Sequence, residues 1–184
     1  NDSGIMLIKM KRGMGKSTLS MALDNNGMNK LKIDNCCTRT YYINDSYASK
    51  LNNFTSTIND MFRVNKEGKI LFRGNIPMIS SESDNNSQEL VKLLSFYREK
   101  YYNMYGTEKL LFVIDGIDEI NKYDRKTIFD FIPKMNELEN GIFIICTCRT
   151  DEELIESDFI LREVKKINYN SNIFIENKDL NYIE

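Results

Sequence analysis

The residues best suited to chemistry lie in one short segment, Gly13-Met14-Gly15-Lys16-Ser17-Thr18. Its two glycines allow successive backbone N–H groups to curl inward and form an anion-binding concavity. Lys16 can reach a terminal phosphate as a point charge, and Ser17 can place its hydroxyl on Mg²⁺. We therefore expect this segment to bind a phosphate group, with Thr18 as a further contact.

The segment departs at one position from the phosphate-loop pattern G-x-x-x-x-G-K-[ST]. Met10 stands where the pattern has its first glycine, whereas Gly15, Lys16 and Ser17 match its last three positions. A long side chain at that turn could tighten or misplace the entrance of the loop. Two interpretations stay open at this point: a phosphate site of altered affinity, and a surface loop that is basic by chance.

Carboxylates follow directly on the apolar run of residues 111–114. Ligands of open α/β sheets bind at the carboxyl ends of the strands. Asp115 is therefore expected to hold Mg²⁺, directly or through water. Asp118 or Glu119 could orient or deprotonate an attacking water. The alternative for all three is a solvated acidic loop after a strand.

A further apolar run, residues 142–146, also ends in polar residues, among them Thr147 and Arg149. Arg149 could pair with a terminal phosphate and report whether it is present. The alternative is an ordinary surface arginine paired with Asp151 or Glu152.

Strands and helices must position these groups. Strands are predicted at residues 5–8, 38–43, 110–114 and 142–146, with weaker ones at 69–72 and 159–167. Helices are predicted at 19–23, late in 44–61, from 86 to 105, from 124 to 132 and from about 151. Asn86 with Glu89 and Asp124 are the expected helix caps, and Gly106 is an expected helix stop. This alternation predicts an α/β fold with a mostly parallel sheet.

The amino-acid composition excludes several classes of catalytic and binding site. The 184 residues include 25 Lys plus Arg, 27 Asp plus Glu and no His, for a net charge of −2. The lack of His excludes Ser-His-Asp triads and His-based metal sites. Balanced charge argues against nucleic-acid binding by bulk attraction to phosphate. The four cysteines lack C-x-x-C spacing and are expected to be buried free thiols; with no signal peptide or long apolar run, we expect a cytoplasmic chain.

Together the motifs resemble those of the NACHT and NB-ARC class of signal-transducing (STAND) P-loop NTPases. Residues 13–18 resemble a Walker A loop. Asp115-Gly116-Ile117-Asp118-Glu119 is similar to the extended Walker B motif of that class, which has a small residue directly after the metal aspartate. Thr147-Cys148-Arg149 is similar to its sensor motif, usually Thr-Ser-Arg. The NACHT branch fits best, because the full acidic set is present.

The resemblance, which spans about residues 5–149, implies a three-layer P-loop NTPase sandwich. Its mostly parallel five-stranded sheet would have the phosphate-loop strand at the centre. Residues 1–184 would form a single nucleotide-binding domain, excised from a longer protein before its lid and winged-helix regions. The implied ligand is ATP in preference to GTP, with Mg²⁺. The implied cofactor-binding residues are Gly13, Met14, Gly15, Lys16, Ser17 and Thr18, the metal ligands Ser17 and Asp115, and the catalytic residues Asp118, Glu119 and Arg149.

Such a domain would act as a nucleotide-gated switch, with slow or no hydrolysis in isolation. Its partners would be the nucleotide, other domains of a longer parent chain, and further copies of itself when nucleotide is bound. No membrane partner and no direct nucleic-acid partner are expected. Two alternatives stay open: a small P-loop kinase, and a degenerate non-enzymatic scaffold. An AAA+ ATPase would normally carry Glu where this chain has Gly116.

Overall fold

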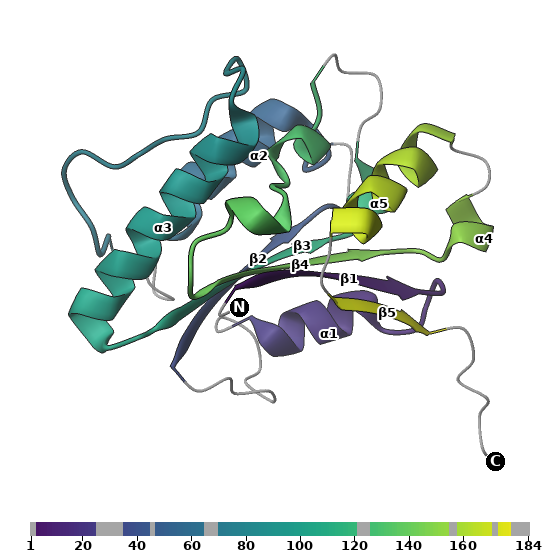
Figure 1. The fold of residues 1–184 in the computed structure, drawn as a ribbon, viewed down its shortest axis with the longest axis horizontal. Helices are drawn as coiled ribbons and strands as arrows, with labels where there is room; N and C mark the ends of the chain where they lie inside the picture. The colour runs from purple at the N-terminus through teal and green to yellow at the C-terminus, as the bar shows by residue number, and fades with distance from the viewer. Residues whose placement is uncertain are drawn as a thin grey trace.

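The computed structural model of the chain describes residues 3–24, 35–44, 47–64, 70–120, 126–154, 158–170 and 173–177. Parallel strands form one sheet in the order β2-β3-β4-β1-β5 (Figure 1). The strands are β1 (Gly4–Met10), β2 (Cys36–Tyr42), β3 (Lys109–Asp115), β4 (Ile142–Cys148) and β5 (Ile173–Asn177). Side chains are described for β1 to β4, whereas β5 is placed by its backbone. The expected α/β architecture with a parallel sheet is confirmed.

The central strand is β4 and not the phosphate-loop strand β1, so the expectation of a central β1 is wrong. Residue Ile144 of β4 pairs with Ile5 of β1 on one side and with Phe112 of β3 on the other. A strand in a sheet that helices cover on both faces needs apolar side chains on both faces, which the run of residues 142–146 provides. The carboxyl ends of β1, β4 and β3 therefore meet at one edge of the sheet.

Helices cover both faces of the sheet and make a three-layer sandwich (Figure 1). One face carries α1 (Lys16–Leu23). The opposite face carries α2 (Leu51–Met61), α3 (Asn86–Tyr105) and α5 (Asp158–Asn170). Shorter pieces are α4 (Asp151–Leu154) and the 3₁₀ turns η1 (Ile117–Glu119), η2 (Ile128–Phe131) and η3 (Met135–Glu137). Within the described residues, no helix is both long enough and apolar enough to cross a membrane.

The core lies between the sheet and α3. Most of the apolar stripe predicted for α3 is buried, but Met104 near its end is 48% exposed. Tyr97 of this stripe stacks on Phe62 with ring centroids 5.4 Å apart. Phe62 in turn meets Phe112 of β3 at 6.0 Å, so aromatic contacts tie the helix to the sheet. Gly106 ends α3 in the left-handed conformation, with φ of 68°, as predicted.

Two predicted elements are wrong in type. The strand predicted at 159–167 is instead part of α5, because Ile160, Val164 and Ile167 recur at helical spacing and are buried on one face. The helix predicted to run to residue 132 is only the 3₁₀ turn η2. Its capping box is formed by Thr127 and Asp130. The predicted cap Asp124 lies outside the described residues.

Other predictions differ in detail. The N-cap of α3 is Asn85, which makes no side-chain capping bond, so the predicted cap formed by Asn86 and Glu89 is wrong. The Glu89 carboxylate instead accepts the backbone N–H of Ser80 at 3.1 Å and holds the preceding loop. The strand predicted at 69–72 is reduced to one isolated bridge, between Val64 and Ile70. Residue 69 lies outside the described part of the chain.

Candidate functional site

A glycine-containing loop, residues 11–15, connects β1 to α1. Gly13 and Gly15 have φ of 80° and 87°, in the left-handed region that glycine adopts without a steric penalty. The loop closes with a hydrogen bond from Met14 N to Lys11 O at 3.2 Å, and α1 then begins at Lys16. The first N–H groups of a helix have no acceptor within it and lie at the positive end of its dipole. The loop and the start of α1 thus have a geometry suited to binding an anion, and phosphate binding there stays a prediction.

Met10 does not distort the entrance of this loop. It is the last residue of β1 and pairs with Asn177 of β5, so its backbone is extended. Among the described residues, Asn35 is the only non-glycine residue with a positive φ. Because the first position of the pattern belongs to a strand here, it has no conformational need for glycine.

Asp115 is the point at which three elements meet. Its Oδ2 accepts a hydrogen bond from the hydroxyl of Ser17 at 2.7 Å. Its Oδ1 accepts two more, from Ser20 at 2.8 Å and from Thr147 at 2.6 Å. The carboxylate, only 5% exposed, thus contacts α1 and β4 from its place at the end of β3. Ser20 recurs one helical turn after Ser17, which is the signal by which the sequence could have revealed it.

The adjacent oxygens of Ser17 and Asp115 fit the ligand preference of Mg²⁺, which binds through one or two protein oxygens plus phosphates. Within the described part of the chain, no three His, Cys, Asp or Glu side chains converge to hold a metal by themselves. A divalent ion here would complete its coordination with water and with oxygens of a bound phosphate.

Gly116 makes the sharp turn that follows Asp115. Its φ is 82°, and a Cβ at this position would lie 2.7 Å from the carbonyl oxygen of Ile43. The same stretch is fixed by a hydrogen bond from Ile43 N to Asp115 O at 2.9 Å. The end of β2 thus packs so closely against the turn that only glycine fits, which explains the small residue after Asp115.

The two remaining acidic residues, in η1, have different surroundings. The Asp118 side chain is 1% exposed and accepts hydrogen bonds from both the backbone N–H and the Nε of Arg149. Asp118 is therefore the partner of Arg149, instead of Asp151 or Glu152. This hydrogen bond raises the pKa of Arg149. Glu119 is exposed, and its pKa is raised above the ordinary value, first by desolvation and then by the charge of Asp118.

Some of the predicted site residues line a cavity of about 570 Å³. Its lining residues are Lys16, Ser17, Met21, Asp24, Tyr42, Ile43, Asn44, Asp115, Gly116 and Glu119. The structure therefore brings Lys16 and Ser17 together with Asp115 and Glu119. The ion pair of Asp118 and Arg149 lies outside this lining, which separates the two halves of the predicted catalytic set.

The short helix α4 buttresses the loop in a way that the sequence does not reveal. The buried Nζ of Lys9, at the end of β1, lies 2.6 Å from Asp151 Oδ1. The Glu153 carboxylate accepts the backbone N–H of Arg12, at 3.1 Å and 3.2 Å to its two oxygens. An amide of the loop thus binds an anionic group already, which fits the anion-binding geometry of the segment.

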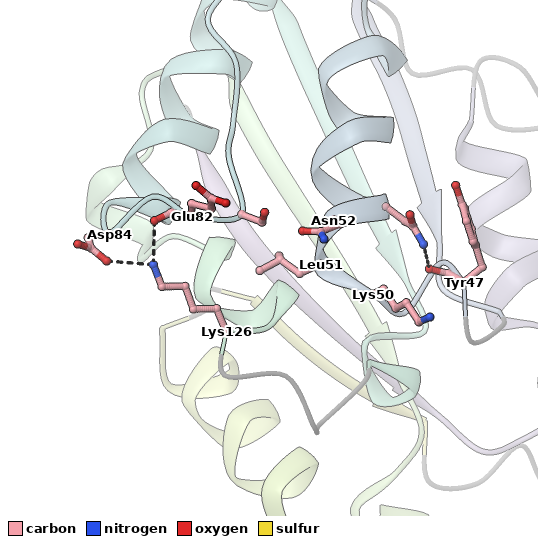
Figure 2. A pocket seen from close by; sticks show the side chains of 9 residues that line it. Tyr47, Lys50, Leu51, Asn52, Glu82, Asp84 and Lys126 are labelled. Atoms are coloured by element: carbon pink, nitrogen blue, oxygen red, sulfur yellow. Dashed lines mark hydrogen bonds and ion pairs between the residues drawn. The ribbon is translucent and has the colours of Figure 1, made fainter.

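A larger cavity, of about 910 Å³, lies elsewhere and contains none of the predicted site residues (Figure 2). It opens beside the first turn of α2, where Leu51 and Asn52 lie. At one end of this cavity, Lys126 contacts Asp84 Oδ1 at 3.0 Å and the carbonyl oxygen of Ser83 at 2.6 Å. These contacts already provide hydrogen-bond acceptors for the Lys126 ammonium group. We therefore place the candidate site in the smaller cavity, where charged groups and hydroxyls lie together.

The fold and the site define an α/β protein of the P-loop NTPase-like class. Residues 1–149 match the family described as Nephrocystin 3, N-terminal, and the chain belongs to this family. The match contains all three motifs, from the glycine loop to Arg149.

Solved structures give a distant likeness. One is described as Drosophila ORC bound to AT-rich DNA and Cdc6: identity is 9%, the TM-score is 0.39, and 96% of this chain and 48% of that chain are covered. Another is described as Drosophila ORC bound to GC-rich DNA and Cdc6, with 8% identity, a TM-score of 0.38 and coverage of 96% of this chain and 49% of that chain. The chain spans about half the length of these solved chains. No curated protein matches it.

Proposed function

We propose that this chain binds a Mg²⁺–nucleoside triphosphate, ATP in preference to GTP, and acts as a nucleotide-gated switch of the NACHT-like signal-transducing type. The observation that carries the proposal is the 2.7 Å hydrogen bond from Ser17 Oγ to Asp115 Oδ2. It joins the phosphate loop to the acidic strand end, 98 residues away in the sequence. A basic surface loop and a solvated acidic loop would have no reason to meet with these two side chains.

Each part of the site has a separate task in this proposal. The amides around Gly13, Met14 and Gly15 and the start of α1, including Thr18, bind phosphate oxygens, and Lys16 adds a point charge. Ser17 and Asp115 hold Mg²⁺. When bound, the ion neutralises charge on the terminal phosphates and polarises them.

Hydrolysis, where it occurs, is assigned to Glu119. Glu119 lines the cavity with Lys16, and desolvation raises its pKa, which makes its carboxylate a stronger base than an ordinary glutamate. Asp118 is less suited to this task because its carboxylate is committed to Arg149. Asp118 instead holds Arg149 in place as the candidate sensor of the terminal phosphate. A single, solvent-exposed carboxylate as the base fits slow hydrolysis.

The wider role follows from the same proposal. Residues 1–184 serve as one nucleotide-binding domain of a longer cytoplasmic protein, whose other domains and further copies are its partners. The nucleotide then acts by favouring one arrangement of those partners over another, which requires different affinities for the two arrangements.

Metal-dependent binding tests this proposal. Labelled ATP is titrated against the wild type and Asp115→Asn, with Mg²⁺ and with EDTA, and ADP, GTP and GDP are used as competitors. The wild type should bind more tightly with Mg²⁺ than with EDTA, and Asp115→Asn should lose that difference, because an amide is a poorer Mg²⁺ ligand than a carboxylate. Equal binding by the wild type with Mg²⁺ and EDTA would contradict the metal site, and competition by GTP as strong as by ATP would contradict the base preference.

A further inference from the structure

The two oxygens of Asp115 have different partners. Oδ1 accepts two hydroxyl groups, at 2.8 Å from Ser20 and 2.6 Å from Thr147. Oδ2 accepts one, from Ser17 at 2.7 Å. Of these three hydroxyls, Ser17 is exposed at the cavity, whereas Ser20 and Thr147 are 0% and 1% exposed. One edge of the carboxylate therefore faces buried protein, and the other faces the candidate metal site.

The hydroxyl of Thr147 has a defined direction. Its Oγ1 accepts the backbone N–H of Gly116 at 3.1 Å, in the turn directly after Asp115. A hydroxyl has a single proton, and with Gly116 supplying a donor to the oxygen, the Thr147 proton points to Asp115. Thr147 thus fixes both the carboxylate and the turn that follows it.

Ser20 holds the carboxylate from the opposite element. It lies on the buried side of α1, one turn after Ser17, so its hydroxyl reaches Asp115 from the same helix that carries the candidate metal ligand. The two hydroxyls, from α1 and β4, prevent the carboxylate from rotating about its Cβ–Cγ bond. A carboxylate that could rotate would present either oxygen, or neither, to a metal.

We propose that Ser20 and Thr147 are positioning residues, which together hold Oδ1 of Asp115 so that Oδ2 stays directed at Ser17 and the bound divalent cation. This inference rests on the proposed function and adds two residues to it that do not themselves touch the metal. Groups that orient a metal ligand in this way typically contribute a factor of about 10 to 100 to metal affinity.

The test compares nucleotide affinity with Mg²⁺ and with EDTA, as a ratio. Ser20→Ala and Thr147→Val should each lower this ratio by about 10-fold, while affinity in EDTA stays within about twofold of the wild type. Thr147→Ser keeps the hydroxyl, so its ratio should equal that of the wild type. Because Mn²⁺ has a paramagnetic signal, its affinity in the presence of nucleotide gives a second, direct measurement of the same effect.

Matched controls separate positioning from folding. Ser95→Ala removes a buried hydroxyl of α3 that has no hydrogen-bond partner among the described residues, and Thr55→Val removes a buried hydroxyl of α2 that is bonded only to a backbone oxygen. Both should leave the ratio unchanged. A merely structural loss would weaken binding equally with and without metal, and thermal unfolding of each variant records any loss of fold.

The outcomes are distinguishable. Unchanged ratios in Ser20→Ala and Thr147→Val, with a metal-dependent wild type, would overturn the positioning of Asp115 and leave the proposed function intact. A wild type without metal-dependent binding would overturn both. If Thr147→Val does not fold, Ser20→Ala still tests the proposal, because it removes one of the two hydroxyls. Thr147→Ser, which retains the hydroxyl at position 147, is then its control.

Discussion

Three carboxylates within five residues do three different things in this protein. Asp115 accepts hydroxyl groups and faces the phosphate loop, Asp118 is buried against Arg149, and Glu119 is exposed at the cavity. Their residue type is nearly the same, so their separate tasks come from burial and from their partners. The turn at Gly116 creates this division, because it directs the chain into η1 directly after Asp115.

Glu119 is expected to make a small, pH-dependent contribution to stability. Its pKa is raised in the folded protein, so the folded state binds this proton more tightly than the unfolded state does. The stabilisation is complete below the ordinary pKa of 4.5 and is lost as the pH rises through the raised value. Above that value Glu119→Gln should therefore melt higher than the wild type, by on the order of 1 °C because the side chain is largely exposed.

Thermal unfolding from pH 4 to pH 7 measures this effect as the difference between the wild type and Glu119→Gln. The exposed Glu139 provides a control, since Glu139→Gln removes a charge away from the cavity. If the melting temperature of Glu119→Gln exceeds that of the wild type by less as the pH rises, the expected direction of the Glu119 pKa shift is wrong.

Gly116 is expected to be far less tolerant of substitution than Gly106. Both have a positive φ, so alanine costs each about 1 kcal/mol in backbone strain. An added Cβ at Gly116 would also meet Ile43 O at 2.7 Å, whereas nothing lies within 4 Å at Gly106. Gly116→Ala should therefore lose about 1–3 kcal/mol more than Gly106→Ala in urea unfolding. Equal losses would contradict the close approach of β2 to this turn.

At the scale of elements, the glycine-containing loop after β1 lies between α1 and α4. α4 supplies two carboxylates, one to the buried Lys9 at the end of β1 and one to the backbone of Arg12 in the loop. The same helix follows Arg149 by only two residues. The loop and the candidate sensor are therefore linked through a single short helix.

Lys9 and Asp151 are expected to be energetically coupled. Asp151→Asn takes a charged partner from a lysine that is 2% exposed and should cost about 1–3 kcal/mol. Lys9→Met removes the buried charge itself and should cost less, because an apolar side chain of similar length can fill the space. In urea unfolding the double variant should be more stable than the sum of the single losses predicts. Strict additivity would contradict a direct interaction.

The sequence predicted those elements whose residues carry a local signal. Residues 110–114 and 142–146 are continuous apolar runs, because β3 is buried on both faces and β4 is buried on one face and at least half-buried on the other. The prediction of a strand at 159–167 is wrong although the sequence carries the opposite signal: Ile160 and Val164 recur at helical spacing, and both are buried on one face of α5. Local pattern cannot reveal that β4 lies between β1 and β3, since pairing is decided by packing across the whole sheet.

The site was predictable to the same extent. The sequence indicated Lys16, Ser17 and Asp115 through loop and strand-end patterns, and their assignment as ligands stays a prediction. The structure adds the pairing of Asp118 with Arg149. It also adds the hydrogen bond between Glu153 and the backbone of Arg12 in the loop, two residues that are 141 positions apart in the sequence. Contacts between such distant residues leave no spacing pattern in a single sequence.

At the scale of the whole molecule, several cysteine thiols and tyrosine hydroxyls are buried in their neutral, protonated form. Burial raises the pKa of Cys37 to about 11, of Cys146 to about 12 and of Tyr97 to about 12. The pKa values of Cys148 and Tyr101 are raised further, again mainly by burial. All four cysteines are free thiols, as predicted; Cys37, Cys146 and Cys148 are buried, whereas Cys36 is only half-buried.

The protein is therefore expected to lose stability in alkali. The folded state holds these protons more tightly than the unfolded state, so the stabilisation is complete below pH 9 and is lost as the pH rises from the ordinary thiol pKa of 9.0 towards 12. The melting temperature should fall by at least about 5 °C between pH 8 and pH 11, and Cys146→Ala should make the fall shallower. A constant melting temperature over this range would contradict the burial of these groups.

The central claim is that the loop after β1 binds a nucleotide phosphate, and one titration tests it most directly. Labelled ATP with Mg²⁺ is titrated against the wild type, Lys16→Ala and Lys92→Ala, which removes an exposed lysine of α3 as a charge-matched control. Loss of a charged hydrogen bond to phosphate should weaken binding by Lys16→Ala by about 10- to 100-fold, while Lys92→Ala binds like the wild type. Equal affinity in all three proteins, or no binding by any of them, would contradict the account.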